Sequence, residues 1–464
     1  MFHLWETQMT SIGQPRFAAL LRTYLDMHPE RHGATERARP ARSIGTDLTG
    51  MVVGTSSGGS VRGEELHSED RAVAQGGRDL VIVTRVLAHY RVPLIARLTD
   101  LGLSCAVVVA GASHGVTWGD PGETSSSGVE VVRCSRARGW RGDVLRACSA
   151  LAPRMMVIEH GARLDFAWTL LLSAAPGGAA KVLWTHGIEN RERATGRRTL
   201  SGVARWLQLR LCDAVLCYDI EMAEQLTRRL RGKIVCAAPN STDGAPIIGV
   251  FRDTGPLQRM SLKHERGLRH RFYLLGLGRL IPGKELGRLV DVLLKVRRVH
   301  PDTGLLLVGD GPERATIAGL ASGRGLSLDG DVVFAGEILD RVELARWVLC
   351  ADVHICPGYA GLNVVDALFA GLPTVLSEPG PRGPFHSPEW RYLRECAGGL
   401  FAPRPGNESL ADVITTYFQL PDAERRMISE SCAEYASSHL GMDPMAEGFR
   451  SILTALNGVA PVSG

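Results

Sequence analysis

The sequence predicts an α/β protein with two doubly wound parallel sheets in tandem domains. Its 464 residues are too many for one ordinary core. Short apolar runs of strand length alternate with longer amphipathic segments, which is the pattern of a parallel sheet covered by helices. This series occurs twice, on either side of the polar stretch 251–270, which we interpret as a linker.

The two series set the expected domain boundaries. We expect a first domain at 78–250, a second domain at 271–440, and a C-terminal helix and tail at 441–464. The apolar runs of the first domain lie at 80–83, 105–110, 129–132, 155–160, 181–186, 214–218 and 233–238, and those of the second at 273–277, 304–309, 331–336, 352–356 and 373–377.

The first 77 residues differ from the rest in composition. They have little apolar periodicity and many Arg, Gly, Ser and Glu residues, so we expect a disordered extension. A tail that binds a partner and a start codon chosen too far upstream both stay open.

Composition narrows the classes of function. Hydrophobic residues make up 45% and charged residues 22%, as in ordinary globular proteins, and the net charge of +4 is small for this length. We therefore expect no nucleic acid partner, while contact with an anionic membrane surface stays open. The ten cysteines form no CxxC pair and no apolar run has the length of a membrane span, so we expect a cytoplasmic protein.

One stretch at the start of the second domain, Phe272 to Leu293, predicts a strand, a glycine loop and a helix. Arg279 and Lys284 add two positive charges where such a loop offers backbone amides and a positive helix end, so a phosphate group is the expected ligand. The glycines of the loop are Gly276, Gly278 and Gly283.

Two common phosphate motifs fit this loop poorly. The third glycine is too far along for a dinucleotide-binding fingerprint. The spacing from Gly278 to Gly283 and Lys284 resembles a P-loop, but Glu285 stands where Ser or Thr would hold magnesium. Pro282 also removes one of the amides that such a loop supplies.

Four further motifs occur in a fixed order along the chain. APNSTD at 238–243 precedes the glycine loop, and LLLVGDGPER at 305–314, VVFAGEI at 332–338 and ADVHICPGYAGLNVVDALFAGLPTV at 351–375 come after it. With them the chain resembles the family 4 glycosyltransferases, retaining enzymes of the GT-B fold that use a nucleotide-diphosphate sugar. The resemblance is clear from about residue 210 to 400. It implies two Rossmann-like domains that face an interdomain cleft.

The resemblance assigns the donor side of this cleft. It implies that Arg279 and Lys284 grip the donor diphosphate, and that Glu337 and Ile338 lie where the nucleobase is read. It also implies donor contacts from Gly278, Tyr359, Gly361, Leu362 and Asn363.

Most members of the family carry two glutamates eight positions apart, one on the donor sugar and one on the ribose. Here the second is Asp366, which we expect to accept the ribose hydroxyls, and the first is Gly358. A subset of the family has this form, followed by a histidine, proline, glutamate segment that is represented here by His386, Pro388 and Glu389. The sugar side of the cleft is therefore unassigned.

The resemblance also implies roles in and near the first domain. His186 follows a predicted strand and corresponds to the histidine near the transferred sugar; a histidine with a purely local role is the alternative. Tyr90 and Arg91 correspond to an acceptor-side segment, or cap a helix. We place Glu389 with them on the acceptor side.

We expect no cofactor and no metal. Asp329 and Asp331 spell the DxD of metal-dependent glycosyltransferases, but they precede a predicted strand, so a turn explains them better. The predicted activity is transfer of a hexose-type unit from a nucleotide-diphosphate sugar to a hydroxyl of a glycan, lipid-linked or small-molecule acceptor, with retention. The alternatives are a P-loop nucleotide hydrolase and a silent nucleotide-sugar-binding subunit.

Overall fold

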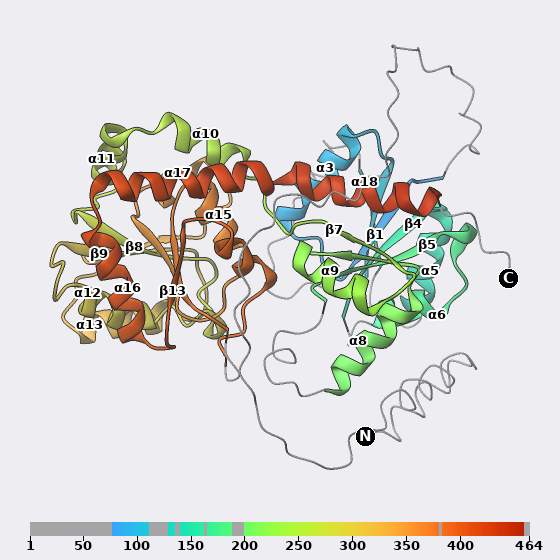
Figure 1. Ribbon diagram of the computed structural model, residues 1–464, viewed down its shortest axis with the longest axis horizontal. Coiled ribbons are helices and arrows are strands. Elements are labelled where there is room, and N and C mark those ends of the chain that lie inside the picture. The colour runs from blue at the N-terminus through green and yellow to red at the C-terminus, as the bar shows by residue number, and fades with distance from the viewer. Residues whose placement is uncertain are drawn as a thin grey trace. The chain divides into compact units, whose positions relative to one another are not determined.

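The computed structural model describes residues 77–110, 129–134, 140–161, 165–187, 199–379 and 383–458. Within these ranges the chain folds into two parallel sheets flanked by helices (Figure 1), as predicted. The extension expected at 1–77 lies outside the described residues apart from Gly77.

The first sheet has seven parallel strands in the order β3-β2-β1-β4-β5-β6-β7. Every apolar run predicted for the first domain forms one of them. The strands are β1 (Leu80–Thr84), β2 (Cys105–Val109), β3 (Glu130–Arg133), β4 (Met155–Glu159), β5 (Ala180–Thr185), β6 (Ala214–Cys217) and β7 (Ile234–Ala237).

Helices and short helical turns connect these strands and cover both faces of the sheet. They are η1 (His89–Arg91), α3 (Val92–Asp100), α5 (Trp140–Leu151), α6 (Asp165–Leu172), η2 (Pro176–Gly178), α8 (Leu200–Leu211) and α9 (Ile220–Arg229).

The second sheet has six parallel strands in the order β10-β9-β8-β11-β12-β13. Five of them were predicted; the edge strand β13, whose GLFA run is mostly half-buried, was not. The strands are β8 (Phe272–Leu277), β9 (Thr303–Val308), β10 (Val332–Gly336), β11 (Val353–Cys356), β12 (Thr374–Ser377) and β13 (Gly399–Ala402).

The helical segments of the second half are η3 (Pro282–Lys284), α12 (Arg288–Val296), α13 (Arg314–Gly323), α14 (Arg341–Val348), α15 (Asn363–Phe369), η4 (Pro388–Arg394), α16 (Asn407–Gln419) and α17 (Asp422–His439). Asp340 caps helix α14, since its side chain accepts a hydrogen bond from the Glu343 amide.

The stretch expected as a linker is helical over most of its length. Helix α10 (Ala245–Asp253) ends in it and α11 (Pro256–Glu265) lies inside it. Helix α11 buries no residue, which is why its sequence shows no apolar stripe. Arg259 and Lys263 tie it instead to Asp352 in the second domain, at N–O distances of 3.0 and 3.3 Å.

The last helix returns to the first domain. Helix α18 (Met442–Gly458) packs against β7 and α3 (Figure 1), whereas α17 lies beside α15 in the second domain. Met445, Phe449 and Ile452 are fully buried in the same core as β1. The chain therefore passes between the domains twice.

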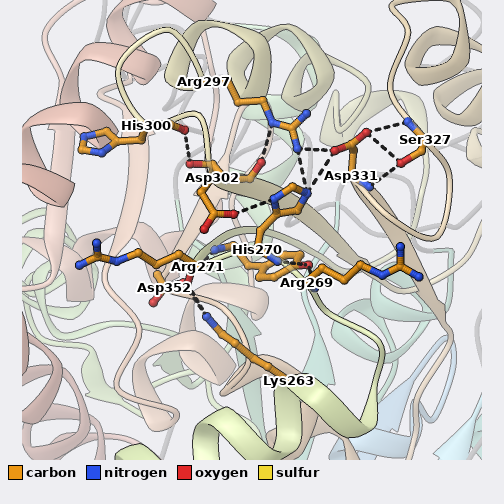
Figure 2. A network of polar contacts seen from close by, with 12 residues as sticks. Lys263, Arg269, His270, Arg271, Arg297, His300, Asp302, Ser327, Asp331 and Asp352 are labelled. Carbon is orange, nitrogen blue, oxygen red and sulfur yellow. Dashed lines mark hydrogen bonds and ion pairs between the residues drawn. The ribbon is translucent and has the colours of Figure 1, made fainter.

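A polar network closes the end of the second sheet where strands β8, β9 and β10 begin. His270 contacts Asp302 at 3.0 Å and Asp331 at 3.1 Å, and Arg297 donates to Asp331 at 2.6 Å (Figure 2). Burial alone would raise the pKa of Asp331. The hydrogen bonds from the Ser327 amide and from Arg297 nevertheless hold that pKa far below its usual value.

We expect Asp331→Asn to lower the free energy of unfolding by about 1.5 kcal/mol at neutral pH, because it removes charged hydrogen bonds. The folded-state pKa of Asp331 is depressed, so its contribution is complete above its usual pKa of 3.8 and is lost as the pH falls below that value. Urea unfolding between pH 7 and 3 measures this: the difference between the wild type and the variant should be full at pH 7 and should begin to shrink once the pH falls below 3.8.

Asp302→Asn is the matched control, because the Asp302 side chain is 63% exposed and contacts only the rim of the network. Its effect should stay within about 0.5 kcal/mol. A constant difference between wild type and Asp331→Asn across this pH range would contradict the assigned role of the charge.

Candidate active site

A cavity of about 510 Å³ is lined by residues that follow strands of both sheets. In doubly wound sheets such a position, at the carboxyl ends of the strands, is where ligands bind. All of the site residues predicted from the sequence line this cavity: Tyr90, Arg91, His186, Gly278, Arg279, Lys284, Glu337, Ile338, Tyr359, Gly361, Leu362, Asn363, Asp366 and Glu389.

The strand order brings these segments together. Each sheet reverses its order where two central strands meet, β1 beside β4 in the first and β8 beside β11 in the second. Thr84 ends β1 and Glu159 ends β4, and the Thr84 hydroxyl donates to Glu159 at 2.9 Å. In the second sheet, Gly278 follows β8 and lines the same cavity.

The loop that carries Lys284 differs from the predicted one. A single 3-10 turn, η3, ends at Lys284, and Glu285 then takes a left-handed conformation with φ of 51°. Helix α12 begins only at Arg288. The expectation that Lys284 lies at a helix start is therefore wrong, because Pro282 starts a separate turn and Glu285 interrupts the helical run.

The Lys284 ammonium points toward the cavity from this turn. Its Nζ donates to Asn363 Oδ1 at 3.1 Å and lies 5.1 Å from the centre of the Tyr359 ring. Burial lowers the pKa of Lys284, and the nearby Arg279 lowers it further, while Glu389 raises it. An anionic ligand here would stabilise the charged form of Lys284.

Asn363 is itself fixed by a buried chain of hydrogen bonds. Its Oδ1 also accepts from the Gly361 amide at 2.9 Å, and its Nδ2 donates to His354 Nε2 at 3.1 Å. Burial lowers the pKa of His354 to about 3, so the ring is neutral. Nε2 then accepts, and Nδ1 donates to the Thr374 hydroxyl at 3.1 Å. This series of hydrogen bonds fixes Asn363 Oδ1, the acceptor that positions Lys284.

Four further donor-side residues come from two loops and one helix of the second domain. Arg279 is exposed and lines the cavity two residues beyond β8, and Glu337 and Ile338 follow β10 directly. Asp366, in α15, accepts hydrogen bonds on Oδ1 from Thr242 at 2.6 Å and from Arg341 at 2.7 Å. These two contacts fix the orientation of its carboxylate beside the cavity.

The first domain contributes an aromatic wall. The His186 ring packs against Tyr218 in a tilted arrangement, with a centroid separation of 4.2 Å. His186 is exposed where it lines the cavity, but desolvation by the surrounding site lowers its pKa, so its imidazole is neutral near pH 7. The Arg91 guanidinium lies 4.4 Å from the Trp184 ring centre and donates to Asn240 Oδ1 at 2.7 Å. Arg91 is thus held by stacking and by a hydrogen bond.

In the histidine, proline, glutamate segment, His386 and Ser387 fix a neighbouring loop, and Glu389 lines the cavity. His386 accepts from the Ala360 amide at 3.1 Å, and Ser387 accepts from the Tyr359 hydroxyl at 2.8 Å. Both bonds fix the loop that follows β11. Two residues further on, Glu389 is 1% exposed and accepts a hydrogen bond from Asn240 Nδ2.

The turn η4, which carries Glu389, is joined to the first domain by buried polar contacts. Arg391 pairs with Asp219 at 2.8 Å, with side chains 6% and 3% exposed. The Tyr392 hydroxyl donates to the Tyr218 carbonyl at 3.1 Å. These contacts hold Glu389 against residues of the other sheet.

Several cavity residues were not singled out from the sequence. Two of them, Asn240 and Thr242, lie in the APNSTD motif. Glu159 ends β4 and Tyr218 directly follows β6, positions that could have identified them, whereas Trp184 lies inside β5. Arg341 gave no signal, because at the start of α14 it has the pattern of an ordinary surface arginine. The residues are Glu159, Trp184, Tyr218, Asn240, Thr242 and Arg341.

The DxD sequence formed by Asp329 and Asp331 has a structural role. Asp329 and Asp331 lie in the turn between α13 and β10, at the opposite end of the strand from the cavity, and Asp331 is held by Ser327 and Arg297. Across the described ranges no group of three or more His, Cys, Asp or Glu side chains could hold a metal ion. In the same ranges no helix is long and apolar enough to cross a membrane.

Comparison with known proteins agrees with the motif order. Residues 271–417 match the family model described as Glycosyl transferases group 1. A GDP-mannose-dependent alpha-(1-6)-phosphatidylinositol dimannoside mannosyltransferase of Mycobacterium tuberculosis is 30% identical over 164 residues, which span 35% of this chain and 39% of that relative. A glycogen synthase of the same species is 24% identical over 341 residues, 69% of this chain and 75% of the relative.

Solved structures agree on the fold. Alr3699/HepE of Anabaena, in complex with UDP and glucose, has a TM-score of 0.59 at 15% identity, over 82% of this chain and 100% of its own. WaaG, a glycosyltransferase involved in lipopolysaccharide biosynthesis, has a TM-score of 0.54 at 13% identity, over 82% of this chain and 100% of its own. The chain therefore has the predicted GT-B fold.

Proposed function

We propose that this chain, whose second domain matches the group 1 glycosyltransferases, transfers a hexose-type unit from a nucleoside-diphosphate sugar to a hydroxyl acceptor. One observation carries the proposal: a single cavity gathers Arg279 and Lys284 from one domain with His186 and Arg91 from the other. The acceptor is a glycan, a lipid-linked sugar or a small molecule. We also propose that the protein contacts the inner face of a membrane.

The chemistry requires stabilisation of the leaving diphosphate as the glycosidic bond breaks. Lys284 and Arg279 would bind its oxygens, and the neutral His186 would lie beside the transferred sugar. We propose that the reaction uses no metal ion, with the two cations balancing the charge that builds up on the diphosphate.

We further propose that the reaction retains configuration, with the donor phosphate accepting the acceptor's proton on the same face of the sugar. The acceptor oxygen then forms the new bond to the anomeric carbon as the bond to the diphosphate breaks. Isolation of a covalent glycosyl-enzyme on a carboxylate of the first domain would contradict this route.

The loop geometry argues against a P-loop hydrolase. In a P-loop the lysine and the next hydroxyl residue begin a helix whose amides surround the phosphates. Here Glu285 is left-handed, and its side chain pairs with Arg288 at 2.6 Å. A carboxylate at this point would repel a magnesium-bound nucleotide's phosphates.

Thermal-shift screening separates the candidate functions. We expect UDP, GDP or the matching nucleotide sugar to raise the melting temperature in the presence of EDTA. Magnesium-dependent ATP hydrolysis would support the P-loop alternative. Binding of a nucleotide sugar with no turnover, either hydrolysis or transfer to added acceptors, would support a silent subunit.

A further inference from the structure

We infer that Glu389 supplies the carboxylate that binds a hydroxyl of the transferred sugar, in place of the glutamate that this chain lacks at position 358. The inference rests on the proposed function and changes the acceptor-side placement expected from the sequence. It assigns the sugar end of the cavity to the turn η4.

Glu389 has one carboxylate oxygen that the protein leaves without a partner. Its Oε1 accepts from Asn240, while Oε2 is buried and has no hydrogen-bond partner in the described structure. A buried acceptor without a donor is costly, by about 1 to 3 kcal/mol, and native proteins keep few of them. Since Glu389 lines the cavity, a bound ligand can supply the missing donor.

Glu389 is bound by Asn240, whose own orientation is fixed by Arg91. Asn240 accepts from Arg91 through Oδ1 and donates to Glu389 through Nδ2, so the cation and the carboxylate allow only one orientation of the amide. Burial lowers the pKa of both Lys284 and His186, and the Glu389 charge opposes this effect at both. Glu389 therefore lies close enough to act on the phosphate-binding lysine and on the histidine of the other domain.

The ligand group at Oε2 must be a donor. A phosphate oxygen is an acceptor and would be repelled by the carboxylate, whereas a sugar hydroxyl donates and carries no charge. Two more buried polar atoms without a partner line the same cavity, His89 Nδ1 and Trp184 Nε1. A polyhydroxyl group held beside the diphosphate matches this set of free donors and acceptors.

Position 358 cannot supply this carboxylate. A Cβ atom built on Gly358 would lie 2.8 Å from the Gly283 carbonyl oxygen and 2.9 Å from the Lys284 carbonyl carbon and oxygen. The Tyr359 amide donates to the Gly283 carbonyl at 3.0 Å, which keeps the two loops in contact. The lysine loop thus fills the space that a side chain at 358 would need, and Glu389 is a glutamate of the same cavity with a buried oxygen that lacks a partner.

Calorimetric titration of the full chain with UDP, UDP-glucose, GDP and GDP-mannose tests the inference. For the pair that the wild type binds, Glu389→Gln should weaken the nucleotide sugar at least tenfold and the nucleoside diphosphate less than twofold. Glutamine keeps the Asn240 contact through its oxygen and places a donor where Oε2 stood. Glu395→Gln is the matched control, because Glu395 is exposed just beyond the same turn and contacts Tyr435.

The outcomes separate the two proposals. If Glu389→Gln weakens both ligands equally, or neither, the inference is overturned while the proposed function stands. If the wild type binds none of the four compounds, the proposed function falls and the inference with it. Should Glu389→Gln fail to fold, Glu389→Asp, which shortens the carboxylate by one methylene, is judged by the same selective loss.

Discussion

Replacing Lys284 with alanine is expected to lower turnover of the proposed transfer reaction about 10² to 10³ fold at saturating donor. The ammonium is mostly surrounded by protein and held by Asn363 at 3.1 Å. At an effective dielectric near 20, one charge about 4 Å from a phosphate oxygen contributes roughly 4 kcal/mol, before desolvation is subtracted. Loss of an oxyanion-hole donor has a comparable effect on rate.

Steady-state kinetics with the nucleotide sugar identified by the thermal-shift screen measure this effect. Lys295→Ala is the matched control, because Lys295 lies on α12, outside the cavity, and pairs with Glu408 near the surface. It should keep turnover within about twofold of wild type. Near wild-type turnover in Lys284→Ala would remove Lys284 from the diphosphate clamp.

The sequence predicted the sheets well because most of their strands are buried on both faces. Runs such as Cys105–Val109 and Thr303–Val308 are fully buried along their length, so each appears as a continuous apolar segment bounded by turn residues. Strand β13 lies at an edge and is mostly half-buried, which leaves a weaker pattern. Continuous burial therefore made most strands easy to predict, while the less buried edge strands β3 and β7 were predicted from short apolar runs alone.

The site was predictable where backbone topology fixes it. His186, Gly278 and Glu337 each follow the carboxyl end of a parallel strand, and the two sheets bring those ends to one cavity. Contacts made between distant side chains were not predictable. Arg341 reaches Asp366 across 25 positions of sequence, and Asn240 reaches Glu389 across 149.

The lysine loop shows why a local motif was misleading. A glycine loop before an amphipathic segment predicts a helix that begins at the lysine, and the apolar positions of α12 are indeed buried. The left-handed Glu285 delays the helix start to Arg288, and single-residue backbone conformations of this kind have no periodic signature. The loop instead packs against Gly358, a contact that depends on the whole second sheet.

Gly358→Glu, which restores the residue common in the family, is expected to damage the protein. Its Cβ would overlap backbone atoms of Gly283 and Lys284, which cannot move aside as a flexible side chain can. Overpacking of this kind costs about 3 kcal/mol at the upper end of its usual range. Because the displaced backbone carries Lys284, we also expect nucleoside-diphosphate affinity to fall at least tenfold.

Chemical denaturation and the calorimetric titration described for Glu389 measure both effects. Gly319→Glu is the matched control: it adds the same side chain on exposed α13, where a Cβ meets no atom within 4 Å, and it should be neutral or slightly stabilising. A Gly358→Glu protein with unchanged stability and tighter nucleotide-sugar binding would mean that position 358 has room for the missing carboxylate. In that case the sugar end of the cavity would lie beside the lysine loop, and Glu389 would lose its proposed role.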